Sequence, residues 1–426
     1  MKKLVALLLA LAMVACLFAG CAEKNEEPTT TVTPDTEVTD TPDTESTEPA
    51  PAPNADYKVA MITDYGDITD QSFNQATYEG AKAWCEENGV DFTYYKPTGD
   101  STAERVASVE QAIDEGYNVL VMPGYAFGGT IVETCEQYPD VKFIALDVAA
   151  GDILETAVTM AGEDYSYNPS DYNIADYIDL SNVYCAVYQE ELAGYMAGYT
   201  AVKLGYTKLG FLGGMAVPAV VRYGYGFVQG VDAAATEMGN ASDVSVKYAY
   251  GNQFYGDADI TAAMDTWYND KTEVVFACGG GIWTSAAEAA AKVGQKVIGV
   301  DVDQAGVIAK YAGVDGMTVT SAMKGLYPAT YDTLTDVIVN GNWDKYVGKI
   351  ATLGLVSGTD PEANYVQIPM GDGTQWSDSF TQDDYKAMVK DMFDGKITVS
   401  NNTSSDVSAA DFATVITVDD QGSIKG

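Results

Sequence analysis

The segment KVAMITDYGDITDQSFN, residues 58–74, decides the fold predicted for this chain. Its first five residues, KVAMI, are typical of a buried strand, and they lead into a polar turn that contains glycine. The turn ends in Ser72, Phe73 and Asn74, at the start of a predicted helix. Small ligands bind where the strands of an open α/β sheet end. The segment therefore predicts such a sheet, with an aromatic ring, amides and carboxylates at its ligand-binding edge.

The residues that follow repeat the pattern of strand and helix. Ser101 and Glu104 have the spacing of a capping box, and Gly89 is expected to end the first helix. Because the predicted strands are almost continuously apolar, helices should cover both faces of a parallel sheet. We expect strands at 58–62, 91–96, 118–123 and 141–147, and helices at 72–88, 101–116 and 130–138.

A second series of strands and helices begins near residue 182 and follows the same logic. Two doubly wound α/β lobes in one chain predict a hinged pair with a cleft between the strand ends. Here we expect strands at 182–189, 208–214, 244–251, 273–281, 296–303, 316–323 and 349–356, helices at 190–205, 222–239, 257–269, 284–294 and 327–341, and a last helix with a short strand within 380–400.

Domain boundaries follow from these two series. Lobe one is expected to comprise residues 57–185 and about 322–348, and lobe two residues 186–321 and about 349–400. The C-terminal tail, 401–426, is polar and is expected to pack loosely.

The N-terminal residues 1–21 are predicted to be a lipoprotein signal peptide. A positive start precedes the apolar stretch Leu4–Gly20, which could alternatively be a short membrane span. Small residues just before Cys21 favour cleavage there and lipidation of Cys21, with Cys16 as a weaker competing site. Residues 22–56 are Thr, Pro and acidic residues that cannot form a core, which predicts a disordered linker. The protein is thus expected on the outer face of the bacterial cell membrane.

Composition excludes several classes of function. The chain of 426 residues has 23 basic and 62 acidic residues and a net charge of −39, which argues against nucleic acid as a partner. Histidine is absent, which removes Ser-His-Asp triads and HExxH metal sites. The remaining cysteines have no CxxC spacing, so we expect no metal site and no cofactor. Buried free thiols are favoured, with a disulfide still possible, for Cys85, Cys135, Cys185 and Cys278.

The candidate site residues are carboxylates that follow apolar strands. Asp64, Asp147 and Asp301 have this placement, although a single such Asp is more often a helix cap or an Asx-turn. Phe73 could stack on a flat ligand or belong to the core. Lys324 follows an apolar strand and could be a surface lysine, a ligand donor or half of an ion pair in the cleft.

Catalysis is not expected. No phosphate-binding motif follows a strand. The glycines at 279–281 could bind an anion, but the negative charge of the nearby aspartates favours a neutral ligand. Paired carboxylates would allow glycosidase chemistry, but only at a separation that a sequence does not give. The prediction is a binding protein, and turnover of a nucleoside or glycoside would overturn it.

Several motifs together resemble the basic membrane protein (BMP) family of bacterial lipoproteins. TDYGDITDQSFNQATYEG (63–80) is similar to the family's N-terminal signature. The resemblance continues through YPDVKFIALD, FLGG, RYGYGFVQGV, YGNQFYGD, VIGVDVDQ and SAMKG, and it ends at DGKITV (394–399). Members are substrate-binding components of ABC importers and mostly bind purine nucleosides. The resemblance implies the type I periplasmic-binding-protein fold, two α/β lobes joined by three crossovers.

The resemblance also implies roles for individual residues. Phe73 and Phe254 would stack on the two faces of a base, and the ribose would lie near Asp301, Lys324 and the backbone at Gly280. Bonds to the base or its neighbourhood would come from Asp64, Asn74 and Asp147.

The chain departs from the family pattern after its glycines. Trp283 stands where a small or polar residue is usual, which bears on specificity for the ribose. The expected function is capture of a purine nucleoside for an ABC permease. The alternatives are a sugar or another small polar solute as ligand, and a signalling receptor of the same fold.

Overall fold

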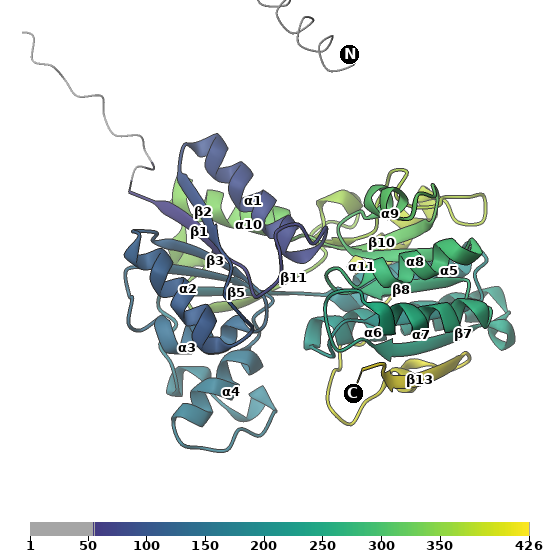
Figure 1. Ribbon diagram of the computed structural model, residues 1–426, viewed down its shortest axis with the longest axis horizontal. Coiled ribbons are helices and arrows are strands. Elements are labelled where there is room, and N and C mark those ends of the chain that lie inside the picture. Colours follow the sequence, from purple (N-terminus) through teal and green to yellow (C-terminus); the bar gives the residue numbers. More distant parts are fainter. Residues whose placement is uncertain (1–53, 55, 426) are drawn as a thin grey trace, which may run out of the picture. The chain divides into compact units, whose positions relative to one another are not determined.

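The computed structural model describes residue 54 and residues 56–425. The predicted signal peptide, Cys21 and nearly all of the predicted linker lie outside these residues. Within them, the strands form two sheets, each in its own α/β lobe (Figure 1). None of the helices in this part of the chain is long and apolar enough to cross a membrane.

Lobe one is built on a six-stranded parallel sheet in the order β11-β5-β4-β3-β1-β2. Its inner strands β3 and β4 are apolar and buried except for Lys142 at the start of β4, as the unbroken runs predict. The elements are β1 (Lys58–Ile62), α1 (Phe73–Asn88), β2 (Asp91–Tyr95), α2 (Thr102–Asp114), β3 (Val119–Pro123), α3 (Phe127–Thr134), β4 (Lys142–Leu146), α4 (Ala150–Met160), β5 (Val183–Tyr188), α10 (Leu326–Leu334) and β11 (Lys349–Leu353).

Lobe two has a seven-stranded sheet in the order β12-β10-β9-β8-β6-β7-β13, in which only β12 runs antiparallel to its neighbour. Its elements are α5 (Glu190–Lys203), β6 (Lys208–Gly213), α6 (Pro218–Met238), β7 (Ser245–Tyr250), α7 (Ala258–Asn269), β8 (Val274–Cys278), α8 (Trp283–Val293), β9 (Lys296–Asp301), α9 (Ala305–Ala312), β10 (Thr318–Lys324), β12 (Val366–Gln367), α11 (Gln382–Phe393) and β13 (Thr417–Ser423).

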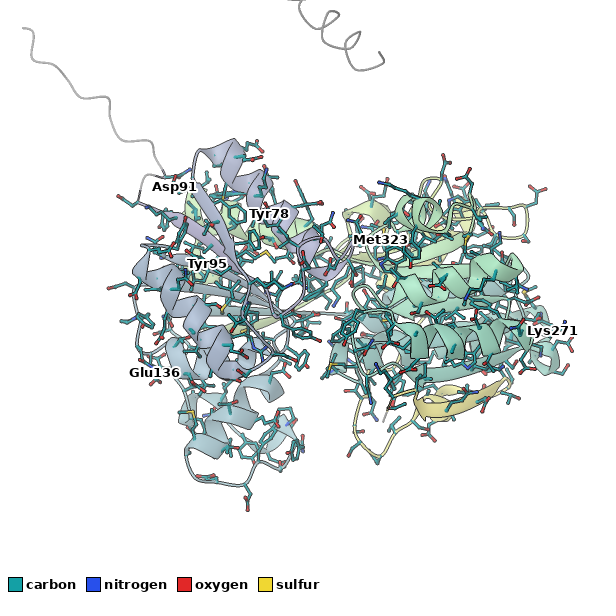
Figure 2. All side chains as sticks on the ribbon, in the orientation of Figure 1. Tyr78, Asp91, Tyr95, Glu136, Lys271 and Met323 are labelled. Atoms are coloured by element: carbon teal, nitrogen blue, oxygen red, sulfur yellow. The ribbon has the colours of Figure 1, made fainter. Side chains whose placement is uncertain are left out.

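Local signals explain several helix ends. Ser101 Oγ accepts a hydrogen bond from the Glu104 amide and donates one to the Glu104 carboxylate, so Ser101 caps α2 as predicted. The capping box is only half formed, because the Ser101 amide makes no hydrogen bond to the Glu104 side chain. Helix α1 ends at Gly89, whose φ of 65° is left-handed. The short helices α4 and α9 were not predicted, and no strand forms within 396–400. Charged side chains such as Asp91, Glu136 and Lys271 lie on the outside of the lobes (Figure 2).

Helices α5 and α6 pack at unusually close range in lobe two. A Cβ on Gly226 would collide with the backbone oxygen of Glu191, and a Cβ on Gly194 with that of Tyr223. Glycine at these places lets the two helix backbones touch. The N-terminal turns of both helices therefore lie together, and this contact positions two charged residues of the site, Glu190 and Arg222.

The chain passes between the lobes after β5, after β10 and between β11 and β12, which confirms the three crossovers expected. The expected boundary at 349 was wrong, because β11 pairs with β5 in lobe one, with Lys349 opposite Tyr184. The last crossing thus follows Leu353. The expectation of a loosely packed tail was also wrong. Residues 417–423 form β13, which pairs with β7.

Candidate functional site

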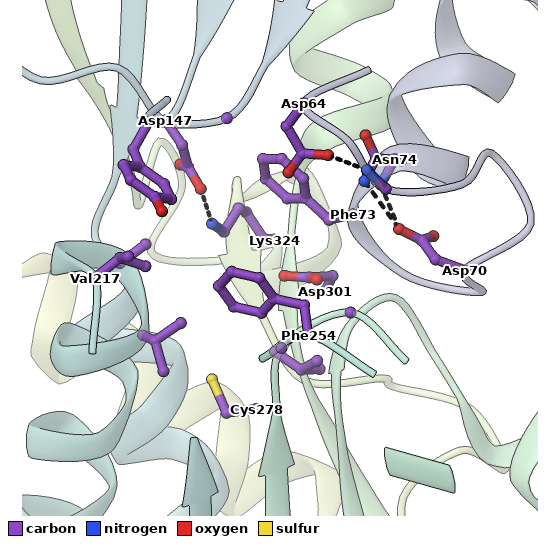
Figure 3. A pocket seen from close by; sticks show the side chains of 18 of the residues that line it. Asp64, Asp70, Phe73, Asn74, Asp147, Val217, Phe254, Cys278, Asp301 and Lys324 are labelled. Atoms are coloured by element: carbon purple, nitrogen blue, oxygen red, sulfur yellow. Dashed lines mark hydrogen bonds and ion pairs between the residues drawn. The ribbon is translucent and has the colours of Figure 1, made fainter. Parts of the chain in front are cut away.

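A cavity of about 470 Å³ lies between the strand ends of the two lobes. Ligand pockets in proteins commonly have volumes of this order. All eight of the predicted ligand-binding residues line it, four from each lobe (Figure 3). They are Asp64, Phe73, Asn74, Asp147, Phe254, Gly280, Asp301 and Lys324.

Lobe one contributes a wall of hydrogen-bonded carboxylates and one amide. Asp64 Oδ1 accepts from the amides of Tyr65 and Gly66, both at 2.6 Å, so it forms an Asx-turn as well as lining the cavity. Asp70 accepts from the backbone and side chain of Asn74 at 2.9 and 3.2 Å. Asn74 Oδ1 is buried and has no hydrogen-bond partner among the described residues. A buried acceptor without a partner is costly unless a ligand satisfies it.

Two phenylalanine rings face the cavity from opposite lobes (Figure 3). Phe73 is the first residue of α1 and packs partly against the core. Phe254 lies in the loop after β7, where its carbonyl accepts from the Gly281 amide at 2.8 Å. A Cβ on Gly214 would collide with the Phe254 ring, and one on Gly279 would lie 2.8 Å from it. Gly214 and Gly279 therefore leave space for the Phe254 ring, and the presence of glycine at these positions is explained without a bound anion.

A buried charge network lies at the base of the cavity. Lys324 Nζ lies 2.5 Å from Asp147 Oδ2 and 3.0 Å from Glu190 Oε1. The other Glu190 oxygen accepts from Arg222 Nε at 2.6 Å. Lys324 thus joins a carboxylate of lobe one to the start of α5, which confirms the cleft ion pair among the alternatives for this lysine.

Glu190 and Arg222 were not predicted as site residues. Glu190 follows the apolar strand β5, so the rule that selected the three aspartates would have selected it too. Arg222 stands in an otherwise apolar part of α6, and a cation in such a setting signals a buried partner.

Two further hydrogen bonds join the lobes beside this network. Ser72 donates to Asp301 Oδ2 at 2.5 Å, and Gln304 Nε2 donates to the Gln71 carbonyl at 2.9 Å. Asp147 and Asp301 take equivalent places after β4 and in the last position of β9, with φ of 60° and 64°. A left-handed backbone is uncommon outside glycine, although Asp tolerates it better than most residues do.

Burial dominates the electrostatics of the carboxyl groups. It raises the pKa of Asp64 and Asp301, and it raises the pKa of Asp147 to about 6, although Lys324 acts in the other direction. Burial also raises the pKa of Asp70 to about 6 and of Asp152 to about 7. Although burial opposes it, Arg222 and Lys324 together lower the pKa of Glu190.

The cavity wall is acidic in sum. Six aspartates and three basic residues line it, so a phosphate or carboxylate on a ligand would be repelled and a neutral or cationic ligand favoured. Tyrosines at the rim, Tyr65, Tyr125 and Tyr255, were not predicted. Their positions depend on turns that lack a sequence pattern.

The structure shows where Trp283 and the cysteines lie. Trp283 packs at 5.2 Å from the Tyr311 ring and is not among the residues that line the cavity. The four described cysteines, Cys85, Cys135, Cys185 and Cys278, are buried free thiols, which confirms the favoured alternative. Cys278 also lines the cavity.

Comparisons with known proteins agree with this architecture. The family model described as "Bmp: ABC transporter substrate-binding protein PnrA-like" matches residues 57–360. The ABC transporter nucleoside-binding protein BmpA of Lactococcus lactis is 26% identical over 358 residues, which cover 81% of this chain and 89% of that protein. A protein of Pyrococcus abyssi named as an uncharacterized lipoprotein is 25% identical over 307 residues, which cover 70% of this chain and 67% of that protein.

A solved structure resembles the described part of the chain as well. The crystal structure of an ABC transporter system solute-binding protein from Aeropyrum pernix K1 matches with a TM-score of 0.60 at 19% identity, over 82% of this chain and 95% of that one. This likeness shows the fold, the type I periplasmic-binding-protein fold that the resemblance implied. The family model covers more than half of the chain, and the family is one of binding proteins, not enzymes. The chain therefore belongs to the Bmp family of PnrA-like ABC transporter substrate-binding proteins.

Proposed function

We propose that this protein captures a purine nucleoside between its two lobes and delivers it to an ABC permease. The observation that carries the proposal is the pair of rings, Phe73 and Phe254, which face one cavity from opposite lobes. A purine base presents two π-faces and a polar edge, so two aromatic walls and a set of acceptors suit it. The nucleoside-binding name of the Lactococcus relative supports the same ligand class.

The acceptors on the walls suit the polar groups of a nucleoside. Asn74 Oδ1 and Asp147 Oδ1 are buried without a hydrogen-bond partner among the described residues, and both line the cavity with Asp64. In the proposal these three residues contact the base. Asp301, Lys324 and the backbone at Gly280 contact the ribose hydroxyls, which can both donate and accept. The acidic wall favours a nucleoside over its phosphorylated forms.

A sugar is the second candidate ligand. Hydroxyl-rich rings also bind between aromatic side chains and carboxylates, and the cavity holds both. The discriminating feature is the second ring. Phe73 and Phe254 both contribute to binding of a base, whereas one stacked ring suffices for a sugar face.

Calorimetry with the full mature chain tests the ligand class. Inosine, guanosine and adenosine should give heat, uridine less, and a panel of neutral sugars none. Phe73→Ala should weaken binding of the best purine nucleoside by roughly 1–3 kcal/mol, by analogy with aromatic–base stacking. Heat from a sugar with none from any purine nucleoside would overturn the proposal, and so would unchanged affinity of the variant.

The proposal includes a lipid anchor at Cys21 that keeps the protein near its permease. The Pyrococcus relative is named a lipoprotein, which supports it. A cell that makes the Cys21→Ser variant should release the protein from its membranes and take up less labelled nucleoside, while the purified variant binds normally. Unchanged membrane retention would contradict the anchor. Unchanged uptake on deletion of the whole chain would favour a signalling receptor over a transport component.

A further inference from the structure

The loop that bears Phe254 spans residues 251–257, between β7 and α7. On its inner side it is tied to its own lobe, because the amides of Gly251 and Asn252 donate to the carbonyls of Gly213 and Gly214 at 2.8 and 3.0 Å. Asn252 has a left-handed φ of 57°. The loop therefore has a left-handed residue two positions before Phe254, a backbone conformation that is uncommon outside glycine.

The C-terminal strand β13 reaches this loop from outside the family's matched region, which ends at residue 360. It lies beside β7 at the edge of the sheet (Figure 1), with Thr417 opposite Ser245 and Ser423 opposite Tyr250. The next residue, Ile424, donates its amide to the Tyr250 carbonyl at 2.8 Å. Because β13 runs parallel to β7, its end arrives where β7 gives way to the Phe254 loop.

Two anchors fix β13 before it reaches the loop. Asp232 on α6 is buried and accepts from the amides of Thr414, Val415 and Ile416 at 2.8, 2.8 and 3.2 Å. The indole of Trp267 on α7 donates to Gln421 Oε1 at 2.9 Å. The strand is thus held against two helices of lobe two along its length.

The end of the segment contacts the loop on both sides of Phe254. Lys425 Nζ donates to Gln253 Oε1 at 2.9 Å and forms an ion pair with Asp257. Asn252 Nδ2 donates to the Lys425 carbonyl at 2.5 Å, and Ser423 Oγ donates to Asn252 Oδ1 at 3.3 Å. Asp257 also caps α7, since its Oδ1 accepts from the Ile260 amide at 3.0 Å. Three loop residues are therefore tied to the C-terminal segment.

We propose that β13 with residues 424–425 is a strap that holds the 251–257 loop in its binding conformation, with Lys425 as the positioning residue. The strap acts through Phe254, so this inference rests on the proposed function. A loop that is ordered before the ligand arrives costs no further ordering on binding, and the affinity is correspondingly higher. If the strap is released, ordering of the loop becomes part of the binding reaction.

A simpler reading is that β13 only covers the edge of the sheet, which protects against unwanted strand pairing. That task requires the paired residues 417–423 and their anchors. It does not require the Lys425 side chain, which lies beyond the paired strand and whose hydrogen bonds and ion pair within the described part of the chain go to Gln253 and Asp257 of the loop. The side chain of Lys425 therefore separates the two readings.

The test uses the full chain and three variants of one residue. Lys425→Ala should speed amide hydrogen exchange within residues 252–257 and weaken nucleoside binding roughly threefold to tenfold, with a less favourable binding entropy. Lys425→Arg should restore most of the affinity, and Lys425→Glu should weaken it further by repulsion from Asp257. The melting temperature should change little, because the Lys425 side chain is partly exposed and its ion pair is correspondingly weak.

Lys292→Ala is the matched control. Lys292 also binds an acidic residue of α7, with its Nζ 3.0 Å from Asp265, but its hydrogen bonds and ion pairs to the described residues go to Asp265 and Glu288 and not to the loop. Equal effects of the two alanine variants would overturn the strap. Faster amide exchange in Lys425→Ala without a change in nucleoside affinity would also overturn the strap, because the order of the loop would then not affect binding. If the unaltered protein bound no nucleoside, the proposed function would fail, and the exchange rates would still decide whether Lys425 holds the loop.

Discussion

The two lobes share one topology and differ in the chemistry at their strand ends. By sheet register, Gly124 after β3 corresponds to Gly279 after β8, with φ of 130° and 137°. Asp147 corresponds to Asp301 in the same way, with φ of 60° and 64°. At both places the lobes have the same residue and the same backbone.

The other two strand ends differ. Asp64 after β1 corresponds to Gly214 after β6, which makes room for the Phe254 ring. Tyr188 at the end of β5 corresponds to Lys324 at the end of β10. The residues that match are those whose backbone is left-handed, and those that differ set the charge and shape of the cavity. At the two positions that differ, lobe one has the acceptor Asp64 and Tyr188, whereas lobe two has Gly214, which leaves space for the Phe254 ring, and the cation Lys324.

Replacing the cation of lobe two should have the largest effect. Lys324→Met keeps the length of the side chain but leaves Asp147 without its counter-charge in a buried site. Breaking a buried pair on one side costs about 3–5 kcal/mol, so urea unfolding at pH 7 should show a loss of that order. The control is Lys345→Met, an exposed lysine 3.8 Å from Asp336, which should cost less than about 1 kcal/mol. Similar losses for both variants would mean that the network is not a buried one.

Replacing Gly214, which leaves space for the Phe254 ring in lobe two, should have the next largest effect, mainly on ligand affinity. The methyl group of Gly214→Ala collides with the Phe254 ring, so the ring must leave its place or the turn must shift. We expect a loss of roughly 1–3 kcal/mol in nucleoside affinity, similar to the loss of a stacked ring. Gly371→Ala is the control, because its Cβ would meet open space. Calorimetry that finds both variants equal to the unaltered protein would show that Gly214 does not position Phe254.

The acceptors of lobe one predict a pH dependence. Burial raises the pKa of Asp152 to about 7 in the folded protein, well above its usual value, so the folded state binds more protons than the unfolded state between about pH 4 and pH 7. Its contribution to stability must therefore fall as pH rises through this window. Asp152→Asn removes the penalty, and it should stabilise the ligand-free protein by about 1–2 kcal/mol at pH 8 and by little at pH 4. Equal effects of the variant at both pH values would contradict the raised pKa.

The sequence predicted those parts of the molecule that follow from local pattern. Buried strands are apolar runs, and the residues just after them must meet at one edge of a sheet, so Asp64, Asp147 and Asp301 could be found. Phe254 lies in a turn without a periodic signal, and it came only from the family resemblance. The glycines at 279–281 were visible as a possible anion cradle, but the ribose contact of Gly280 came from the resemblance.

Other features depend on packing between distant elements. Arg222 reaches the cavity because α5 and α6 touch at glycines, and no sequence pattern gives that distance. The sequence of β11 has no feature that assigns it to one lobe, because each sheet has an edge strand with which it could pair. Strand β13 is polar and almost entirely exposed, so it lacks the alternation that marks a half-buried strand.

The smallest predicted effect concerns the hydrogen bond between Ser72 and Asp301, which joins the two lobes. Ser72 of lobe one donates to Asp301 of lobe two, and both side chains are buried. Ser72→Ala should cost the ligand-free protein about 1 kcal/mol, because the Asp301 carboxyl then lacks this donor. Burial raises the pKa of Asp301, so this carboxyl takes up its proton at a higher pH than an exposed Asp does, and once protonated it needs the donor less. Urea unfolding over a pH series should therefore show a loss that shrinks as the pH falls, and a loss that does not change with pH would mean that Ser72 only fills space.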